Sequence, residues 1–366
     1  VYLGASAGMD RTMQSLNGVG LNAPVNLLIR LQASANSPSI YQFKEGAWQE
    51  TAPSTGKLAY NEKERTLEVQ VPITVLGELK SGDAFQTSVL FGPDNQLHPV
   101  DAPGEIRYIR YGPVTEILNV VDPTGDDFGP GTYTYPKDTV FNPSAFDITN
   151  FNVSSDENNL IFSFSIAGEI TNGWNSPNGF SVQTMDVYID KDPGQSTGER
   201  AFLPGRNAAL AKENGWDIAL WIEGWTPQLV RPDPDNPGLP MSDSEASSAM
   251  RLFIDPGKNA IVASIPMEYF GEGNPADWSY AAAMLSQEGY PAEGIWRVRD
   301  VFPTAEQYKI GGGKGDTNGT RIIDLVVPEG QTPDQAEILS AYTSSNKAFK
   351  DLTADDFAII PLFAVK

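Results

Sequence analysis

Short apolar runs, each ended by a turn residue, constrain this chain more than any other feature. Runs of this kind, rich in β-branched or aromatic side chains, occupy residues 25–31, 67–71, 160–166, 185–189, 218–222 and 260–265. Glycine, proline, asparagine and aspartate bound them, which is typical of strands. In residues 160–166 the even positions are apolar, while Ile161, Ser163 and Ser165 point the other way, as in a strand with one face on a core. The chain is therefore predicted to be all-β, with antiparallel β-sandwich modules of immunoglobulin-like or jelly-roll type.

One segment near the C-terminus has the pattern of a helix. Thr332 is suited to cap its start, Pro333 to take the first helical position and Gln335 to close a capping box. Ile338 and Leu339 then supply an apolar side. The sequence predicts one short helix here, packed on the second sandwich.

Length and charge limit the domain count and the partners. With 366 residues and 40% hydrophobic content, the chain is long enough for about two domains. The 47 acidic and 25 basic residues give a net charge of −22, which repels nucleic-acid backbones and anionic lipid headgroups. Nucleic acid is not an expected partner, and the sequence has no apolar stretch of about 18 residues to predict insertion into a lipid membrane. The absence of cysteine excludes disulfides, thiolate metal sites and a cysteine nucleophile.

An oxygen-rich segment at residues 121–136 (VDPTGDDFGPGTYTYP) is the strongest chemical signal. Asp122, Asp126 and Asp127 lie within six residues. Their carboxylates can turn inward together only if a cation removes their mutual repulsion, and Ca²⁺ prefers such hard oxygen ligands. The alternative is an ordinary acidic turn, because Asp, Gly and Pro are also common turn residues.

A second acidic segment follows at residues 185–194 (MDVYIDKDPG). Asp186 and Asp190 are four residues apart on one face of a predicted strand, and Asp192 lies in the turn beyond. The segment does not match an EF-hand, because no glycine stands at the sixth position and Ala201 replaces the bidentate glutamate. We predict these three aspartates as ligands of Ca²⁺ in a β-sandwich site.

Aromatic residues outside the strand cores are candidates for sugar binding. Pyranose rings stack on flat aromatic faces, while their hydroxyl groups require directional polar partners. Trp174 lies in a polar loop and Trp225 at a predicted strand end, and Trp296 and Tyr290 lie in the later loops. The alternative for each tryptophan is a packing role, since tryptophan is usually mostly buried.

Eight separated motifs now carry a family resemblance. They occupy residues 121–136, 146–151 (FDITNF), 176–181 (SPNGFS), 185–190 (MDVYID), 203–208 (LPGRNA), 216–225 (WDIALWIEGW), 286–290 (SQEGY) and 322–328 (IIDLVVP). Together they resemble the C-terminal module of glucodextranase, which also occurs at the end of amylopullulanases. The resemblance covers residues 113–366. Residues 1–112, with YQFKEGAW and VPITVLG, resemble a shortened β-sandwich of the group that includes carbohydrate-binding and DOMON-type modules.

The resemblance implies a noncatalytic module, extracellular or at the cell surface, associated with enzymes that degrade α-glucans. Its expected partner is a polysaccharide or cell-wall glycan, with an upstream glycoside hydrolase domain or neighbouring copies of the chain as further candidates. No enzyme activity is expected, because no pair of carboxylates is singled out by its spacing and no GxSxG motif accompanies the single histidine. The alternative is a surface-layer, envelope or filament component that assembles through sandwich edges.

Overall fold

The computed structural model divides into two compact units, residues 1–111 (unit 1) and 112–366 (unit 2). The structure describes unit 2 from residue 114, apart from residues 237–239, 256 and 365–366. In unit 1 it describes residues 2–4, 12–16, 20–31, 37–51, 57–61, 66–70, 84–88, 90–91, 98–99 and 104–107. This division lies one residue before the boundary predicted from the sequence.

Unit 1 is built around a six-stranded antiparallel sheet with the order β12-β9-β1-β4-β5-β6. Three further strand pairs are β2 with β3, β7 with β8 and β10 with β11. Leu21, Val25 and Leu28 are buried together, with Tyr41 and Trp48 packed against them. The strands are Tyr2–Gly4 (β1), Thr12–Gln14 (β2), Gly20–Val25 (β3), Leu27–Arg30 (β4), Ser39–Lys44 (β5), Ala47–Glu50 (β6), Lys57–Asn61 (β7), Thr66–Gln70 (β8), Ala84–Ser88 (β9), Leu90–Phe91 (β10), His98–Pro99 (β11) and Gly104–Arg107 (β12).

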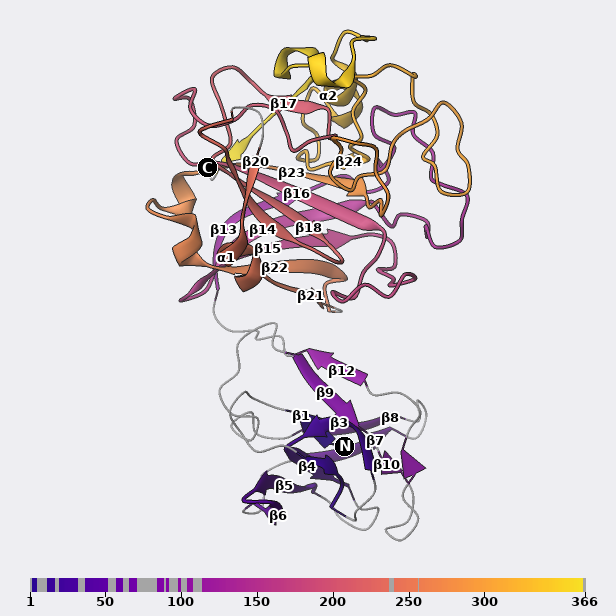
Figure 1. Ribbon diagram of the computed structural model, residues 1–366, viewed down its shortest axis with the longest axis vertical. Coiled ribbons are helices and arrows are strands. Elements are labelled where there is room, and N and C mark those ends of the chain that lie inside the picture. The colour runs from indigo at the N-terminus through magenta and orange to yellow at the C-terminus, as the bar shows by residue number, and fades with distance from the viewer. Residues whose placement is uncertain are drawn as a thin grey trace. The chain divides into compact units, whose positions relative to one another are not determined.

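Unit 2 contains two stacked antiparallel sheets, drawn in magenta to orange in Figure 1. One has five strands in the order β13-β14-β15-β22-β21, and the other has the order β20-β19-β18-β16-β23-β24, with β26 also paired to β23. A short parallel pair, β17 with β25, lies apart from both sheets in the strand pairing. The strands are Thr115–Val121 (β13), Ile148–Ser155 (β14), Asn159–Ile166 (β15), Gln183–Asp190 (β16), Ala208–Leu210 (β17), Ile218–Glu223 (β18), Gln228–Pro232 (β19), Pro240–Asp243 (β20), Arg251–Asp255 (β21), Ala260–Pro266 (β22), Ser279–Ser286 (β23), Asp324–Leu325 (β24), Ala358–Ile360 (β25) and Phe363–Ala364 (β26).

The main core lies between these two sheets. Phe151 and Phe162 of the five-stranded sheet and Val187 and Met284 of the other are all buried in it. Phe162 has the inward position that the alternation in residues 160–166 predicts. The predicted all-β sandwich is thus confirmed for unit 2.

The seven-stranded sheet is also covered on its outer face. Tyr188 and Trp221 point away from the main core into a second buried cluster, where they meet Trp216 and Leu339. Loops, β17 and the C-terminal helix form this covering layer, as the upper part of Figure 1 shows. All eight residues of β16 and of β23 are consequently buried.

Two short α-helices lie in the described part of unit 2, Ser244–Ala249 (α1) and Gln335–Ser340 (α2). The predicted C-terminal helix is α2, but its cap differs from the prediction. Asp334 is the N-cap and Glu337 completes the capping box, so Thr332, Pro333 and Gln335 do not have the expected roles. The unpredicted α1 begins after Asp243, whose side chain accepts a hydrogen bond from Ala246. Short 3₁₀ turns are Met267–Phe270, Pro275–Asp277, Phe349–Asp351 and Ala354–Asp356 (η5).

Candidate metal centre and aromatic surface

Three aspartates from distant parts of unit 2 meet at one end of the sandwich. Asp122 directly follows β13, Asp126 lies in the next turn and Asp324 begins β24. Each offers a carboxylate oxygen, and these oxygens all lie within 4.8 Å of one another. Because β13 belongs to the five-stranded sheet and β24 to the seven-stranded sheet, this cluster connects the two layers. We call Asp122, Asp126 and Asp324, together with Asp147, the acidic centre.

Backbone hydrogen bonds fix one oxygen of most of these side chains. Val327 N–H donates to Asp122 Oδ1 at 2.6 Å, Ile148 N–H to Asp324 Oδ2 at 2.6 Å, and Gly125 N–H to Asp147 Oδ2 at 2.9 Å. These bonds aim the carboxylates and hold them at defined positions.

A second oxygen of each side chain is buried without a partner. The atoms are Asp122 Oδ2, Asp126 Oδ1, Asp147 Oδ1 and Asp324 Oδ1. Buried polar atoms are nearly always hydrogen-bonded, and an unmatched buried carboxylate oxygen carries a large desolvation cost. Three of these atoms belong to the aspartates whose carboxylate oxygens lie within 4.8 Å of one another, and the charge of Asp147 acts on Asp122 and Asp126.

The pKa values of the four carboxylates in the acidic centre also reflect their burial and mutual repulsion. Burial raises the pKa of Asp122 to about 9, and the charges of Asp126 and Asp147 add to the increase. Burial and the charge of Asp147 raise the pKa of Asp126 to about 6, and burial raises that of Asp147 to about 6. Burial, followed by the charge of Asp122, raises the pKa of Asp324 well above its usual range. Each carboxylate therefore destabilises the ionised form of its neighbours.

The surrounding loop is held in place by polar contacts. Gln335 is buried at the start of α2; its Oε1 accepts from Leu325 N–H at 2.5 Å, and its Nε2 donates to the carbonyl of Asp126. Asp127 is buried beside the centre, where the Tyr135 hydroxyl donates to its carboxylate. Asp127 therefore has a hydrogen-bond partner, whereas Asp126 keeps an unmatched oxygen.

The acidic centre suits Ca²⁺ by its donor set. Ca²⁺ takes six to eight oxygen ligands, with carboxylates prominent among them. Asp122, Asp126, Asp147 and Asp324 supply four free carboxylate oxygens, and a divalent cation would remove both the repulsion and the hydrogen-bond deficit. When bound, the ion would supply positive charge and coordination and no chemical transformation.

The other predicted acidic site differs from the acidic centre in its hydrogen bonds. Asp190, Asp192 and Asp217 also bring three oxygens within 4.8 Å of one another. Here the turn itself supplies donors: Asp192 N–H and Gly215 N–H donate to the two oxygens of Asp190 at 3.1 and 3.4 Å. Lys191 N–H donates to Asp217 at 2.8 Å and the Thr197 hydroxyl to Asp192 at 2.5 Å. Burial raises the pKa of Asp190 to about 6.

Asp186 does not join either cluster. Its two oxygens accept from Arg206 Nε at 2.7 Å and Nη2 at 3.1 Å, and both side chains are fully buried. The Tyr188 hydroxyl also donates to Asp186 at 2.9 Å. A fixed guanidinium therefore compensates this carboxylate, and the role of Asp186 as a calcium ligand stays a prediction.

The predicted aromatic residues divide into packed rings and one exposed ring. Trp174 is half-buried and meets Phe141 edge to face, with the ring centroids 5.7 Å apart. Trp296 is half-buried and stacks on Trp221, with a centroid distance of 5.6 Å. Tyr290 is 96% exposed.

Trp225 contacts an arginine side chain. The guanidinium of Arg297, the residue after Trp296, lies 5.7 Å from the centroid of the half-buried Trp225 ring. The backbone around Trp225 is anchored by the buried Glu223, which accepts from Trp225 N–H at 3.1 Å. We call Trp174, Trp225, Trp296 and Tyr290 the aromatic surface.

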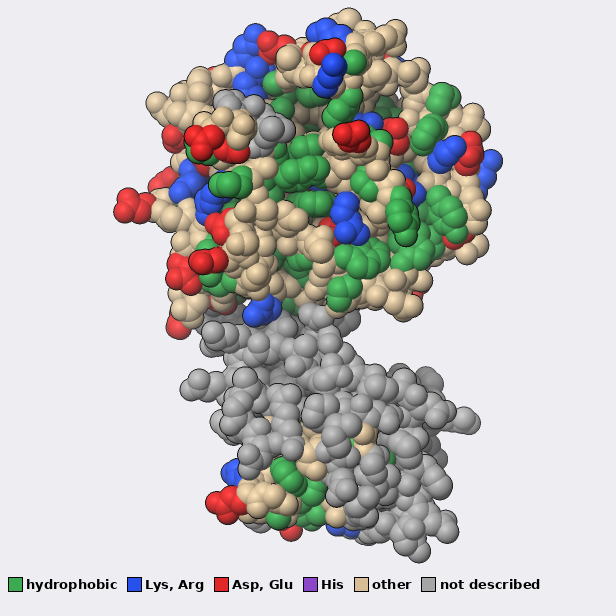
Figure 2. Space-filling model, viewed as in Figure 1, with side chains coloured by type: hydrophobic (Ala, Val, Ile, Leu, Met, Phe, Trp, Pro, Cys, Tyr) green, Lys and Arg blue, Asp and Glu red, His purple; other side chains and the backbone are tan. Residues whose placement is uncertain are grey.

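Figure 2 shows one face of unit 2, where hydrophobic patches alternate with dispersed charged side chains.

Comparison with known protein families decides the identity of unit 2. The model of the SLH-like C-terminal binding module of glucodextranase matches residues 117–353, more than half of the chain. The chain belongs to this family. No curated protein matches the chain. The family resemblance read from the sequence is thus confirmed, and membership indicates a noncatalytic binding module with a cell-surface association.

Two further findings concern unit 1 and the membrane. The family match begins after unit 1, so the resemblance of residues 1–112 to DOMON-type modules stays a prediction. Among the residues that the structure describes, no helix is long and apolar enough to cross a membrane.

Sequence reasoning about this glucodextranase-type module missed Asp147 and Asp324 as part of the acidic centre. Asp147 is 22 residues from its hydrogen-bond donor Gly125, and Asp324 is 176 residues from Ile148. A signal was present in the sequence IIDLVVP, where one carboxylate stands alone among apolar residues. Such a residue is buried with its strand and requires a partner.

Proposed function

We propose that the chain is a noncatalytic module that binds carbohydrate or attaches to the cell surface, and that Ca²⁺ stabilises its fold. The observation that supports the calcium part is the set of four buried carboxylate oxygens without partners in the acidic centre. The family supports the binding part, because it consists of the C-terminal binding modules of glucodextranase.

Calcium in this position would join the two sheets of unit 2. Asp122 follows a strand of the five-stranded sheet, Asp147 precedes β14 of the same sheet, and Asp324 belongs to the seven-stranded sheet. An ion bound by all three would oppose separation of the layers. Because the ion binds the folded state, stability would rise with free Ca²⁺ by about 2.7 kcal/mol at a concentration 100 times the dissociation constant.

The proposed ligand is a polysaccharide of the α-glucan or cell-wall type. Neutral glycans avoid the repulsion that a chain with a net charge of −22 exerts on anionic polymers. The aromatic surface would contact sugar rings, with Tyr290 as its exposed member. The expected setting is extracellular, where an upstream glycoside hydrolase domain would be held close to its polymer.

Calorimetry of the full chain after treatment with a chelator tests both parts. We expect heat on titration with CaCl₂, followed by heat on titration of the calcium-loaded protein with maltotriose or isomaltotriose. MgCl₂ is the matched control and should bind more weakly, since Mg²⁺ requires strict octahedral geometry and retains its waters. Absence of calcium heat would refute the stabilising ion.

A separate result would contradict the proposal that the chain binds carbohydrate. Calcium uptake without sugar heat, and without retention on insoluble α-glucan or cell-wall material, would refute carbohydrate binding. Self-assembly in light scattering under those conditions would favour the surface-layer or envelope component instead. The variant Trp225→Ala should weaken sugar binding while the unfolding temperature changes little, because its ring is only half-buried.

A further inference from the structure

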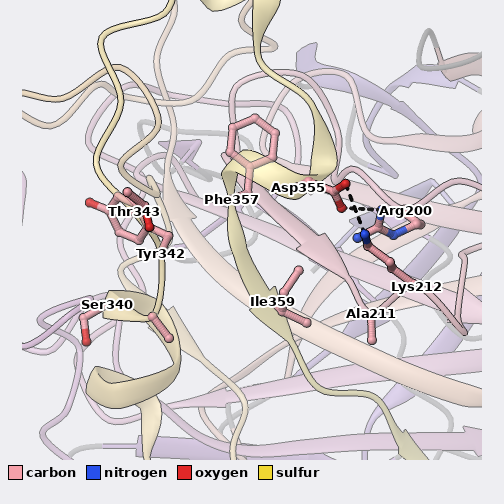
Figure 3. A pocket seen from close by; sticks show the side chains of 10 residues that line it. Arg200, Ala211, Lys212, Ser340, Tyr342, Thr343, Asp355, Phe357 and Ile359 are labelled. Carbon is pink, nitrogen blue, oxygen red and sulfur yellow. Dashed lines mark hydrogen bonds and ion pairs between the residues drawn. The ribbon is translucent and has the colours of Figure 1, made fainter.

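A groove of about 750 Å³ opens in the covering layer of unit 2. Its walls come from the residues after β17, from the end of α2 and the segment that follows, and from η5 with β25 (Figure 3). The volume is within the range of about 300–1,000 Å³ that is typical of small-molecule sites. None of the residues of the acidic centre or the aromatic surface lines it.

One wall of the groove is charged. Arg200 Nη1 donates to Asp355 Oδ1 at 2.9 Å, and Lys212 Nζ lies 3.4 Å from Asp355 Oδ2. Arg200 is also held by its Nε, which donates to the carbonyl of Leu210 at 3.2 Å. The side chains of Lys212 and Asp355 remain 75% and 58% exposed. This wall therefore presents donors and an acceptor side by side to an incoming ligand.

The opposite wall carries hydroxyl groups. Figure 3 shows Ser340, Tyr342 and Thr343 across the groove from Arg200 and Lys212. The Tyr342 ring is held because its hydroxyl donates to Asp316 at 3.1 Å. Hydroxyl groups both donate and accept, so this wall adapts to either role.

Apolar side chains lie between the two polar walls. In β25 the residues on either side of Ile359 are buried, but Ile359 is 40% exposed and lines the groove. Strand alternation fixes this direction, since neighbouring side chains point to opposite faces. Phe357, one residue before the strand, lines the same groove and appears at its end in Figure 3.

We propose that this groove binds a short stretch of a neutral oligosaccharide. The C–H face of a pyranose ring would rest on Ile359 and Phe357, while neighbouring hydroxyl groups of the sugar donate to Asp355 and accept from Arg200 or Lys212. Neutral sugar is favoured over acidic sugar, because Asp355 repels a ligand carboxylate and the chain carries a net charge of −22. This inference rests on the proposed carbohydrate-binding function and adds to the aromatic surface a second site for the same polymer.

Two variants of the full chain test the groove in different ways. Ala211→Trp fills it with a ring and removes no hydrogen bond of the native side chain, while Asp355→Asn keeps the size of the acceptor and removes its charge. Isothermal titration uses maltotriose and isomaltotriose on the calcium-loaded protein. We expect each variant to weaken binding by about tenfold or more, since hydrogen bonds to charged groups are worth about 1.5–3 kcal/mol.

Matched controls lie on other surfaces. Asn158→Trp adds the same ring at the exposed turn between β14 and β15, and Glu306→Gln neutralises a carboxylate in the exposed ion pair with Lys309. Both should bind sugar as the wild type does. Unfolding temperatures within a few degrees of the wild type would show that all four variants are folded.

Three results would overturn the groove, and they separate it from the proposed function. Sugar binding unchanged in Ala211→Trp and Asp355→Asn would overturn the groove and leave carbohydrate binding intact. Loss of binding in Trp225→Ala alone would place the sugar on the aromatic surface instead. Absence of sugar heat in the wild type would overturn the groove together with the carbohydrate part of the proposed function.

Discussion

Two clusters of three aspartates in unit 2 each bring their carboxylate oxygens close together but have different hydrogen-bond partners. In both, the carboxylate oxygens lie within 4.8 Å of one another. In the acidic centre, Asp122, Asp126 and Asp324 each keep a buried oxygen without a partner, whereas in the second cluster backbone N–H groups and a hydroxyl donate to the carboxylates. Proximity of carboxylates alone therefore does not identify a cation site; the count of unmatched oxygens separates these two.

Asp186 is a buried carboxylate whose charge is compensated in a third way. Its charge is compensated by Arg206 in a fully buried ion pair. Unit 2 therefore contains buried carboxylates that are compensated by a fixed cation, by turn hydrogen bonds, or by no partner among the residues that the structure describes. Each kind of compensation predicts a different effect of substitution on stability and on the response to calcium.

The largest effect is expected from Asp186→Ala. Removing one partner of a buried ion pair leaves the other charge uncompensated and costs about 3–5 kcal/mol. We expect the unfolding temperature of the calcium-loaded protein to fall by on the order of 10 °C in calorimetry. The difference between calcium and chelator should persist in this variant, because Asp186 contacts Arg206 and lies outside the acidic centre. A variant as stable as the wild type would contradict the role assigned to the pair.

An intermediate effect is expected from Asp324→Asn. The amide can still accept from Ile148 N–H, but it removes one ligand charge and part of the repulsion with Asp122. Calcium should then no longer raise the unfolding temperature, whereas it should raise that of the wild type by about 5–10 °C at saturation. In chelator the variant should unfold above the wild type. If it unfolds below the wild type there, repulsion does not govern the acidic centre.

The smallest effect is expected from Asp217→Asn in the second cluster. The amide oxygen can keep the hydrogen bond from Lys191 N–H. Stability should change by less than about 1 kcal/mol, and calcium should shift the unfolding temperature as it does in the wild type. A calcium response that disappears would transfer the ion from the acidic centre to Asp190, Asp192 and Asp217, and would reverse the comparison.

Much of the fold could be predicted because alternation and turn residues act locally. The inward position of Phe162 and the existence of α2 follow from patterns of a few residues. The cap of α2 was misplaced by two residues, since Thr332 and Asp334 are both capable caps and only the folded chain selects one. Helix α1 was missed because its serines are poor helix formers, although Asp243 is a favourable cap.

The sites were harder to predict because their members meet across long sequence separations. Asp122 and Asp126 were found from their crowding in one loop. Asp147 and Asp324 could not be added without knowing which strand ends meet, and the same lack of tertiary information left Arg206 unseen beside Asp186. The groove was missed for this reason too, since Arg200 and Asp355 are 155 residues apart.

Burial of the seven-stranded sheet on both faces has a consequence for sequence variation. From Leu118 to Val121 in β13 the burial pattern alternates, so that Asn119 and Val121 face solvent and can be exchanged with little cost. In β16 and β23 every residue is enclosed, and an exchange at any position disturbs one packed layer or the other. Saturation mutagenesis of this module should therefore give continuous eight-residue blocks of intolerance at residues 183–190 and 279–286, and intolerance at alternate positions in residues 118–121.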